Sequence, residues 1–170
     1  MSYTERIKRA ISIIDTTEIC RVIEALHEVK KQGGIVFTMG NGGSGCTASH
    51  FTQDISKGKG YKSICLCDNT ASILAYGNDI AFESIFKEQL STWVTDKDVV
   101  IGISCSGRSM NVIEAVLLAN ERHAVTIGIT GFDGGKLKGI TDIPIHVPIT
   151  DMQICEDCHS IIAHMIYKML

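Results

Sequence analysis

The chain has 170 residues, of which 45% are hydrophobic and 21% charged, so it is long enough for one globular domain with a substantial core. Its net charge of −3 argues against a nucleic-acid surface, which usually needs a basic patch, and no apolar run reaches the length of a membrane span. No signal peptide is visible and the seven cysteines are an odd number, so we expect a cytoplasmic protein with reduced thiols.

The N-terminal part of the chain predicts two amphipathic helices. Apolar residues recur at helical spacing over residues 3–14 and again over 17–32. Thr16 or Thr17 supplies a cap for the second helix, and Gly33 ends it. The apolar stripe of the second helix makes residues 1–32 a candidate oligomer interface.

Beyond these helices, apolar strands alternate with helical segments, a pattern typical of a parallel sheet covered on both faces. Five strands suit a doubly wound α/β sheet with the order 2-1-3-4-5, in which ligands bind at the carboxyl ends of the first and third strands. No internal repeat or linker interrupts the pattern, so we expect a single domain over 1–170. The predicted strands are 35–39, 63–67, 98–103, 124–129 and 143–147, and the predicted helices are 44–56, 70–77, 81–93, 109–121, 134–138 and 152–169.

Two short turns at the ends of strands predict an anion site. The first strand ends in the glycine-rich segment 40–45 (GNGGSG), and the third leads into 104–109 (SCSGRS); a helix follows each turn. Glycines let backbone N–H groups approach a ligand, and a helix N-terminus adds the positive end of its dipole. Two such turns at the switch point of one sheet predict a phosphorylated small molecule held between them.

The first turn also fits a rival interpretation, the dinucleotide-binding fingerprint G-x-G-x-x-G. Gly40, Gly42 and Gly45 satisfy it, and Asp68 follows the second strand, where a ribose-binding acid is expected. The spacing from Gly45 to Asp68 fits loosely, no second domain is available to hold a substrate, and a dinucleotide site has no need of a serine-rich loop. NAD binding is therefore the weaker interpretation.

Histidines and carboxylates on two predicted helices form a candidate metal site. His50 and Asp54 are spaced i, i+4 and share one helix face. On the final helix, Glu156 and His164 differ in direction by about 80°. Nitrogen and oxygen donors of this kind suit Zn²⁺. From spacing alone, however, a solvated helix face is the more frequent outcome, so the pattern leaves the metal open.

Residues 155–159 read C-x-x-C-H, the pattern of c-type haem attachment. We reject haem, because that chemistry belongs to exported proteins and the segment opens a long helix with apolar anchors. Zinc binding through the two thiols is also disfavoured, since no second cysteine pair lies nearby.

Together these segments resemble the phosphoheptose isomerase family of the sugar isomerase (SIS) domain superfamily. The similarity runs over residues 17–170, and the N-terminal helix is shorter than in typical members. The resemblance implies a flavodoxin-like three-layer sandwich that assembles as a homotetramer with sites between subunits. The matching segments are G-N-G-G-S at 40–44, S-H-F-x-x-D at 49–54, G-N-D at 77–79, I-S-C-S-G-R-S at 103–109, I-T-G-F-D-G-G-K at 129–136 and H-x-x-x-x-H at 159–164.

The resemblance also implies an activity and the residues that carry it. The family interconverts sedoheptulose 7-phosphate and a heptose 7-phosphate for lipopolysaccharide or capsule synthesis. By this resemblance Asp54 and His164 would move protons, and one zinc ion per subunit would be held by His50, Asp54, Glu156 and His164. The sugar phosphate would contact Asn41, Gly42, Gly43, Ser44, Asp79, Ser104, Cys105, Ser106 and Ser109.

This chain departs from the family pattern at several of these positions. Asp54 and Glu156 stand where Glu and Gln are usual, Cys105 replaces a threonine, Gly58 an arginine and Gln153 an aspartate. Two carboxylates and two neutral imidazoles would cancel the charge of Zn²⁺, so we expect a well-held metal that is a weaker Lewis acid. The identity of the metal and of the sugar therefore stays open.

The resulting hypothesis is an aldose–ketose isomerase acting through an enediol, with Asp54 as the base and His164 as its acid–base partner. The alternative is a non-catalytic SIS-domain sugar-phosphate sensor or protein-binding regulator, since such relatives lack the active-site set. Two histidines and two carboxylates kept at matching positions favour the enzyme, because a scaffold has no need of them.

Overall fold

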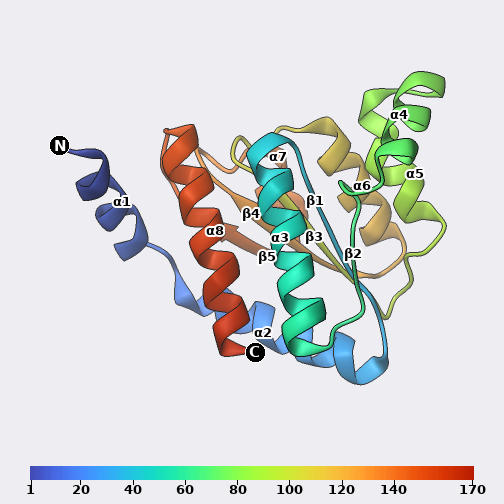
Figure 1. Cartoon of the computed structure of the whole chain (residues 1–170), viewed down its shortest axis with the longest axis horizontal. Helices are drawn as coiled ribbons and strands as arrows, with labels where there is room; N and C mark the ends of the chain where they lie inside the picture. The colour runs from blue at the N-terminus through green and yellow to red at the C-terminus, as the bar shows by residue number, and fades with distance from the viewer.

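A five-stranded parallel sheet forms the centre of the fold (Figure 1). The computed structural model describes residues 1–170, and its strands lie in the predicted order β2-β1-β3-β4-β5. Gly40 at the end of β1 pairs with Ile103 on β3, so the turns that follow these two strands lie side by side. The strands are β1 (Val36–Gly40), β2 (Ser63–Cys65), β3 (Val99–Ser104), β4 (Val125–Thr130) and β5 (Ile143–His146).

Helices cover both faces of the sheet and complete the three layers (Figure 1). One face carries α1 (Tyr3–Ser12), α2 (Thr16–Gln32), α3 (Gly42–Lys59) and α8 (Met152–Met169), and the other carries α4 (Thr70–Asp79), η1 (Phe82–Ser84), α5 (Ile85–Ser91), α6 (Met110–Glu121) and α7 (Gly135–Ile140). Because side chains alternate along a strand, Val36 and Val99 join the core under α2, α3 and α8, whereas Phe37 and Val100 join the core under α5 and α6. None of the helices combines the length and apolar character that a membrane crossing requires.

The predicted elements agree with the structure apart from their ends and one helix. Ala81 is extended, so the helical part of residues 81–93 begins only at Phe82, and it consists of the 3₁₀ turn η1 followed by the α-helix α5, which ends at Ser91. The N-cap of α2 is Asp15 and neither of the two threonines, since Asp15 Oδ1 accepts a hydrogen bond from the Thr17 N–H at 2.8 Å.

Helix α3 begins at Gly42, two residues before the predicted start. The glycine-rich segment is therefore itself the first turn of the helix. Gly42 has a φ of 54°, in the left-handed region that glycine adopts without strain. The first N–H groups of a helix have no partner within it, so this turn is a natural place for an anion.

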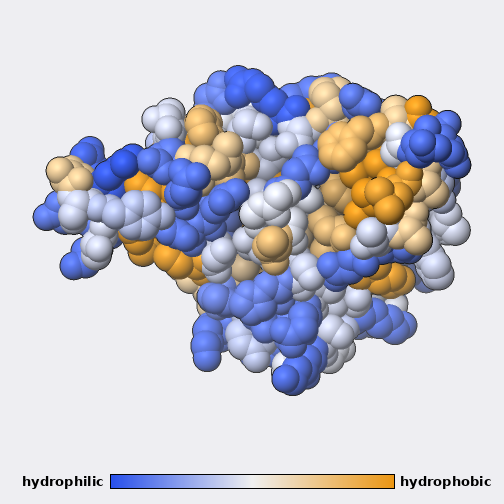
Figure 2. Space-filling model, turned by 45° about the horizontal axis from the view of Figure 1, so that its top comes forward, coloured by the Kyte–Doolittle hydropathy of each residue, from blue (hydrophilic) through white to orange (hydrophobic).

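Most of the apolar stripe of α2 packs in the core of its own chain, while the oligomer interface expected over residues 1–32 stays a prediction. Ile19, Val22, Leu26 and Val29 are all buried against the sheet. Exposed apolar side chains also gather around α4, which buries no residue of its own, and they contribute to the hydrophobic surface in Figure 2. They include Leu74, Ile80, Phe82 and Trp93.

Candidate functional site

The turns after β1 and β3 enclose a cavity of about 310 Å³. This follows from the pairing of Gly40 with Ile103, which brings the two carboxyl ends level. The cavity unites eight of the nine predicted substrate-binding residues, all except Asp79. Its lining residues are Asn41, Gly42, Gly43, Ser44, Ile103, Ser104, Cys105, Ser106, Ser109, Met152 and Glu156.

The turn after β3, residues 104–109, is called the serine loop here. It lies on one side of the cavity and is held in a compact turn. Ser104 Oγ lies 3.0 Å from Ser109 Oγ and accepts a hydrogen bond from the Gly107 N–H at 3.2 Å. Gly107 has a φ of 63°, and a Cβ there would collide with the carbonyl oxygen of Gly134. The loop therefore needs glycine at this position, and its hydroxyl groups are held at the cavity wall.

An unpredicted residue, Asn111, fixes the glycine turn on the other side. The side-chain amides of Asn41 and Asn111 exchange two hydrogen bonds, of 2.9 and 2.8 Å. Asn111 is buried at the start of α6, so this pair joins the first turns of α3 and α6. Asn41 is the N-cap of α3 but makes no capping bond, because its side chain is used in this pair. The sequence offered no sign of Asn111 beyond its place just after the serine loop.

The cavity contains no basic side chain. Arg108, which lies within the serine loop, pairs instead with Asp133 through two hydrogen bonds of 2.8 and 2.6 Å at the exposed surface. The guanidinium holds the pKa of Asp133 down at about 2. Phosphate binding here would depend on hydroxyl groups, backbone amides and the N-terminus of α3.

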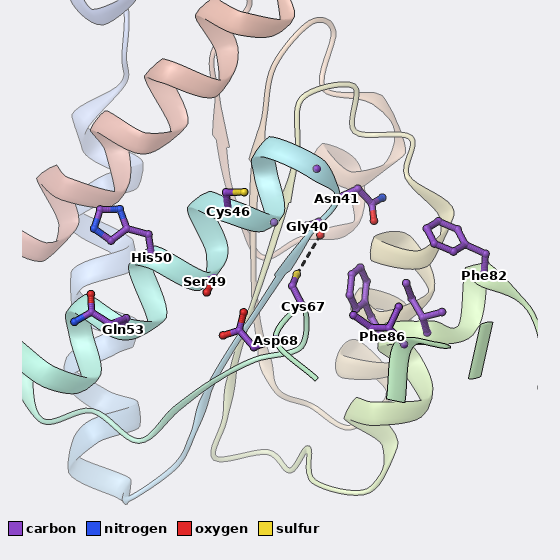
Figure 3. A pocket seen from close by; sticks show the side chains of 14 residues that line it. Gly40, Asn41, Cys46, Ser49, His50, Gln53, Cys67, Asp68, Phe82 and Phe86 are labelled. Carbon is purple, nitrogen blue, oxygen red and sulfur yellow. Dashed lines mark hydrogen bonds between the residues drawn. The ribbon is translucent and has the colours of Figure 1, made fainter. Parts of the chain in front are cut away.

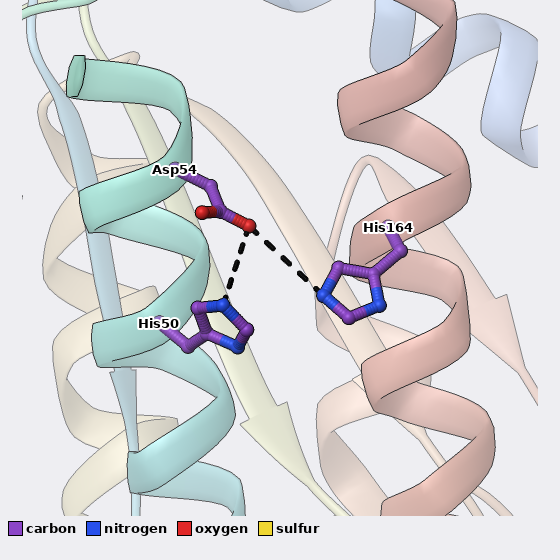
Figure 4. Close-up of side chains that lie close together, drawn as sticks. All are labelled: His50, Asp54 and His164. Atoms are coloured by element: carbon purple, nitrogen blue, oxygen red, sulfur yellow. Dashed lines mark ion pairs between the residues drawn. The ribbon is translucent and has the colours of Figure 1, made fainter. Parts of the chain in front are cut away.

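A cluster of three side chains, those of His50, Asp54 and His164, joins α3 and α8 (Figure 4). His50 Nε2 lies 3.5 Å from Asp54 Oδ2, and His164 Nε2 lies 4.0 Å from the same oxygen. One ligand atom from each residue falls within 4.8 Å of the other two. Two imidazole nitrogens and a carboxylate oxygen are the donor set of an open zinc site, so these residues fit a metal ion.

The expected fourth ligand, Glu156, does not join this cluster. It precedes His164 by eight residues on α8, which separates them by about 12 Å along the helix axis. Its carboxylate lies against Gly43 in the first turn of α3: a Cβ on Gly43 would be 2.5 Å from Glu156 Oε1. The structure therefore brings three of the four predicted metal ligands together and places Glu156 in the cavity between the turns after β1 and β3.

A larger hollow of about 740 Å³ adjoins the first and shares Asn41 and Gly42 with it (Figure 3). His50 and Asp68 line it on one side and Phe86 on another, so it extends from the glycine turn toward the histidine cluster. The predicted sugar-binding residue Asp79 lines neither hollow. It is exposed at the end of α4, where its Oδ1 accepts a hydrogen bond from Asn78 Nδ2 at 2.7 Å.

The two cysteines and the histidine of the C-x-x-C-H segment lie in the core. Cys155, Cys158 and His159 are fully buried. His159 Nδ1 lies 3.9 Å from Cys105 Sγ, its Nε2 has no hydrogen-bond partner, and burial lowers its pKa to about 4. A hydrogen bond from Cys105 lowers the pKa of Cys155 to about 7. The imidazole is therefore neutral at physiological pH, and these side chains are packed as core.

Known proteins share both the sequence pattern and the fold. Residues 2–131 match the family model of the SIS domain. The phosphoheptose isomerase of Geobacter metallireducens is 38% identical over 156 residues, which cover 89% of this chain and 82% of that protein. Phosphoheptose isomerase 1 of Campylobacter jejuni is 35% identical over 158 residues, or 90% and 85% of the two chains.

Two solved structures superpose on almost the whole chain. Phosphoheptose isomerase GmhA from Neisseria gonorrhoeae matches with a TM-score of 0.92 at 31% identity, covering 96% of this chain and 90% of that one. A phosphoheptose isomerase from Francisella tularensis matches with a TM-score of 0.90 at 28% identity and the same coverage. The match therefore extends into α8, which lies beyond the residues that the family model covers.

Proposed function

The chain belongs to the phosphoheptose isomerase family of SIS-domain proteins, and we propose how its own residues carry out that isomerisation. The reaction interconverts sedoheptulose 7-phosphate and a heptose 7-phosphate, for heptose biosynthesis. The phosphate occupies the cavity between the glycine and serine turns, and the reacting carbons extend toward His50, Asp54 and His164. One observation carries this arrangement: the cavity and the cluster lie along the same two packed helices, α3 and α8.

Phosphate binding would fix the orientation of the substrate. The hydroxyl groups of Ser104, Ser106 and Ser109, together with the first turn of α3, surround a site without a basic side chain. Donors that are already held in place lose little freedom when the ligand binds, and the helix dipole favours a negative charge. Holding the distant phosphate places the carbonyl end of the sugar, which lowers the barrier through orientation. The proposed contacts are Asn41, Gly42, Gly43, Ser44, Ser104, Cys105, Ser106 and Ser109.

Proton transfer would then take place at the cluster. Isomerisation removes a proton from the carbon next to the carbonyl and returns one to the neighbouring carbon through an enediol. Asp54 takes the carbon-bound proton, and His164 exchanges a proton with the substrate oxygen. His50, whose Nε2 lies 3.5 Å from Asp54 Oδ2, holds the carboxylate in position.

We propose that His50, Asp54 and His164 also hold a divalent metal ion, with zinc the best match to this donor set. When bound, such an ion polarises a carbonyl and stabilises the negative charge that develops on its oxygen. Both imidazole side chains are more than half exposed, 57% for His50 and 54% for His164, so the cluster is accessible to an ion and to substrate.

We further propose a homotetramer in which a neighbouring subunit completes the site. Asp79 lines neither hollow of its own chain and lies on α4, the helix that also carries the exposed Leu74. An apolar surface of this kind is typical of a subunit interface, and the interface would carry Asp79 to the site of another copy. All seven cysteines are free, which fits a cytoplasmic enzyme.

The two alternative functions have less support. A non-catalytic regulator would have no need of the His50, Asp54 and His164 cluster, and the relatives are named isomerases. A dinucleotide site is disfavoured because the serine loop faces the glycine turn across the phosphate cavity. Neither the matched family nor these relatives point to NAD.

The direct experiment is to incubate the purified protein with sedoheptulose 7-phosphate and follow formation of the aldose. We expect turnover that the cluster substitution Asp54→Asn removes and that Asp96→Asn, an exposed change elsewhere, leaves intact. Failure to convert sedoheptulose 7-phosphate or any other ketose phosphate would overturn the assignment.

A further inference from the structure

Asn41 occupies the N-cap position of α3 without capping the helix. Its backbone is extended, as is usual for an N-cap (φ −106°, ψ 147°), but its side chain makes no hydrogen bond to the first turn. In Figure 3 that side chain points away from α3. The same residue type does cap another helix of this chain, because Asn69 Oδ1 at the start of α4 accepts a hydrogen bond from the Ser72 N–H at 3.1 Å. The choice of amino acid alone therefore does not explain why Asn41 leaves α3 uncapped.

The partner that holds the Asn41 side chain is Asn111, at the start of α6. Each side-chain amide donates one hydrogen bond to the other, at 2.9 and 2.8 Å. Asn111 is only 2% exposed, and its Oδ1 also accepts a hydrogen bond from the Val112 N–H at 3.0 Å, so its own side chain is fixed. The pair directs Asn41 Oδ1, the atom that a capping bond would use, toward α6.

The first turn of α3 keeps its donors as a result. A helix leaves its first N–H groups without a partner inside the helix. An N-cap side chain normally accepts from the second or third of them, here those of Gly43 and Ser44, which line the cavity between the two turns. Free N–H donors at the positive end of the helix dipole favour a phosphate, and a cap on α3 would compete with that phosphate for the same donors.

Building on the proposed function, we propose that Asn111 is a positioning residue for substrate binding. It withholds the Asn41 side chain from the end of α3 and so keeps the first N–H groups of that helix open to the substrate phosphate. Asn111 lines neither of the two hollows, so its effect on the substrate passes through Asn41.

Calorimetric titration of the purified protein with inorganic phosphate tests this. Asn111→Ala frees the Asn41 side chain to cap α3, so the affinity for phosphate should fall by about two- to thirtyfold, the range of a capping interaction. Asn111→Leu, which keeps the bulk of the buried side chain, should show the same fall.

The decisive variant combines Asn41→Ala with Asn111→Ala, which leaves no side chain to cap the helix. It should bind phosphate more tightly than Asn111→Ala alone, by about the same factor, although it lacks one more polar side chain. A purely structural role predicts the opposite order, because a second truncation in the same turn then adds to the damage. Asn69→Ala is the matched control: it removes a capping bond from α4, outside the cavity, and should leave the affinity for phosphate unchanged.

A double variant that binds phosphate no more tightly than Asn111→Ala would overturn the proposal. Unchanged affinity in both single variants of Asn111, or a wild-type protein that does not bind phosphate, would overturn it as well. Phosphate binding is measured independently of turnover. A protein that shows the expected order of affinities and does not isomerise sedoheptulose 7-phosphate therefore contradicts the proposed function and still supports the role of Asn111.

Discussion

Asp54 and His164 meet across two helices from opposite ends of the chain, with 4.0 Å between Asp54 Oδ2 and His164 Nε2 (Figure 4). Packing of the two helices sets this short distance, because Ile55 on α3 and Ile162 on α8 are both fully buried in the same hydrophobic core. A hydrogen-bond-length contact of 3.1 Å between the hydroxyl groups of Thr47 and Ser160 also joins the two helices. The core therefore holds the cluster in place before any ligand binds.

The carboxylate of Asp54 is expected to be essential for turnover, whereas the length of the side chain that carries it matters less. Asp54→Asn should lower kcat by about 10²- to 10⁴-fold, the usual contribution of a general base. Asp54→Glu should keep most of the activity, since it restores the residue usual in the resembling family. Rates of aldose formation decide this, with Asp96→Asn as the matched exposed control. Equal activity of Asp54→Asn and wild type would show that another residue is the base.

Metal removal is expected to affect stability as well as turnover. The purified protein should contain zinc, and His50→Ala or His164→Ala should lose it, whereas His27→Ala, an exposed histidine on α2, should not. Because an ion that binds only the folded state stabilises it, chelation should lower the unfolding temperature by a few degrees. Elemental analysis and thermal melts provide the readouts. A metal content that is unchanged in both cluster variants would exclude this site.

The serine loop should act on substrate binding and little on chemistry. Ser109→Ala removes one hydroxyl from the cavity, and its helix-capping role is not affected because Ser109 makes no side-chain capping bond to α6. A hydrogen bond to a charged group contributes about 1.5–3 kcal/mol, so KM should rise about tenfold or more. If the phosphate is bound equally in ground and transition states, kcat stays nearly constant. Ser12→Ala on α1 is the control, and a fall in kcat alone would contradict the assignment.

Most of the fold was predictable because its signals are local. Continuous apolar strands such as 98–103 alternate with helices, and only a parallel sheet with two covered faces accommodates that pattern. The 3₁₀ turn Phe82–Ser84 was not visible, because no apolar period separates it from the α-helix that follows at Ile85. The sequence could not show that the apolar stripe of α2 packs against its own sheet, since a stripe of Ile and Leu has the same pattern whether it contacts its own sheet or another subunit.

The site was predictable where residues share a helix or a strand end. His50 and Asp54 lie one turn apart, and the two turns follow neighbouring strands, so their positions followed from the topology. Glu156 could not be placed, because an angular difference says nothing about the rise of about 12 Å that separates it from His164. The role of Asn111 depends on a tertiary contact with Asn41, for which the sequence carries no local signal.

The apolar surface around α4 is expected to hold the tetramer together. Leu74 is 66% exposed and α4 buries no residue, so Leu74→Glu should leave the core of the subunit intact. Light scattering after size-exclusion chromatography should show a smaller assembly, and turnover should fall because Asp79 lies on the same helix. Lys31→Glu on α2 should leave the assembly unchanged. A monomeric wild-type protein, or an unaltered mass for Leu74→Glu, would contradict the interface.

The buried His159 should make the protein sensitive to mild acid. Burial lowers its pKa from 6.5 to about 4, so between these values the unfolded chain binds a proton that the folded chain does not. The free energy of unfolding should therefore fall as the pH drops from 6.5 toward 4, by about 2 kcal/mol at pH 5. Burial also lowers the pKa of His146, which adds a change of the same sign.

Urea unfolding at pH 7.5 and pH 5.0 measures this dependence on His159. In His159→Leu the group that takes up the proton on unfolding is gone, and with it the Nε2 atom that has no partner in the core. The difference in stability between the two pH values should shrink by about 2 kcal/mol relative to the wild type. His27→Leu, at an exposed position, should keep the wild-type difference. Equal pH dependence in all three proteins would contradict this prediction, because His159 would then have the same pKa in the folded and unfolded chains. Its full burial argues for a difference, since an imidazolium there would have no water and no carboxylate to stabilise it.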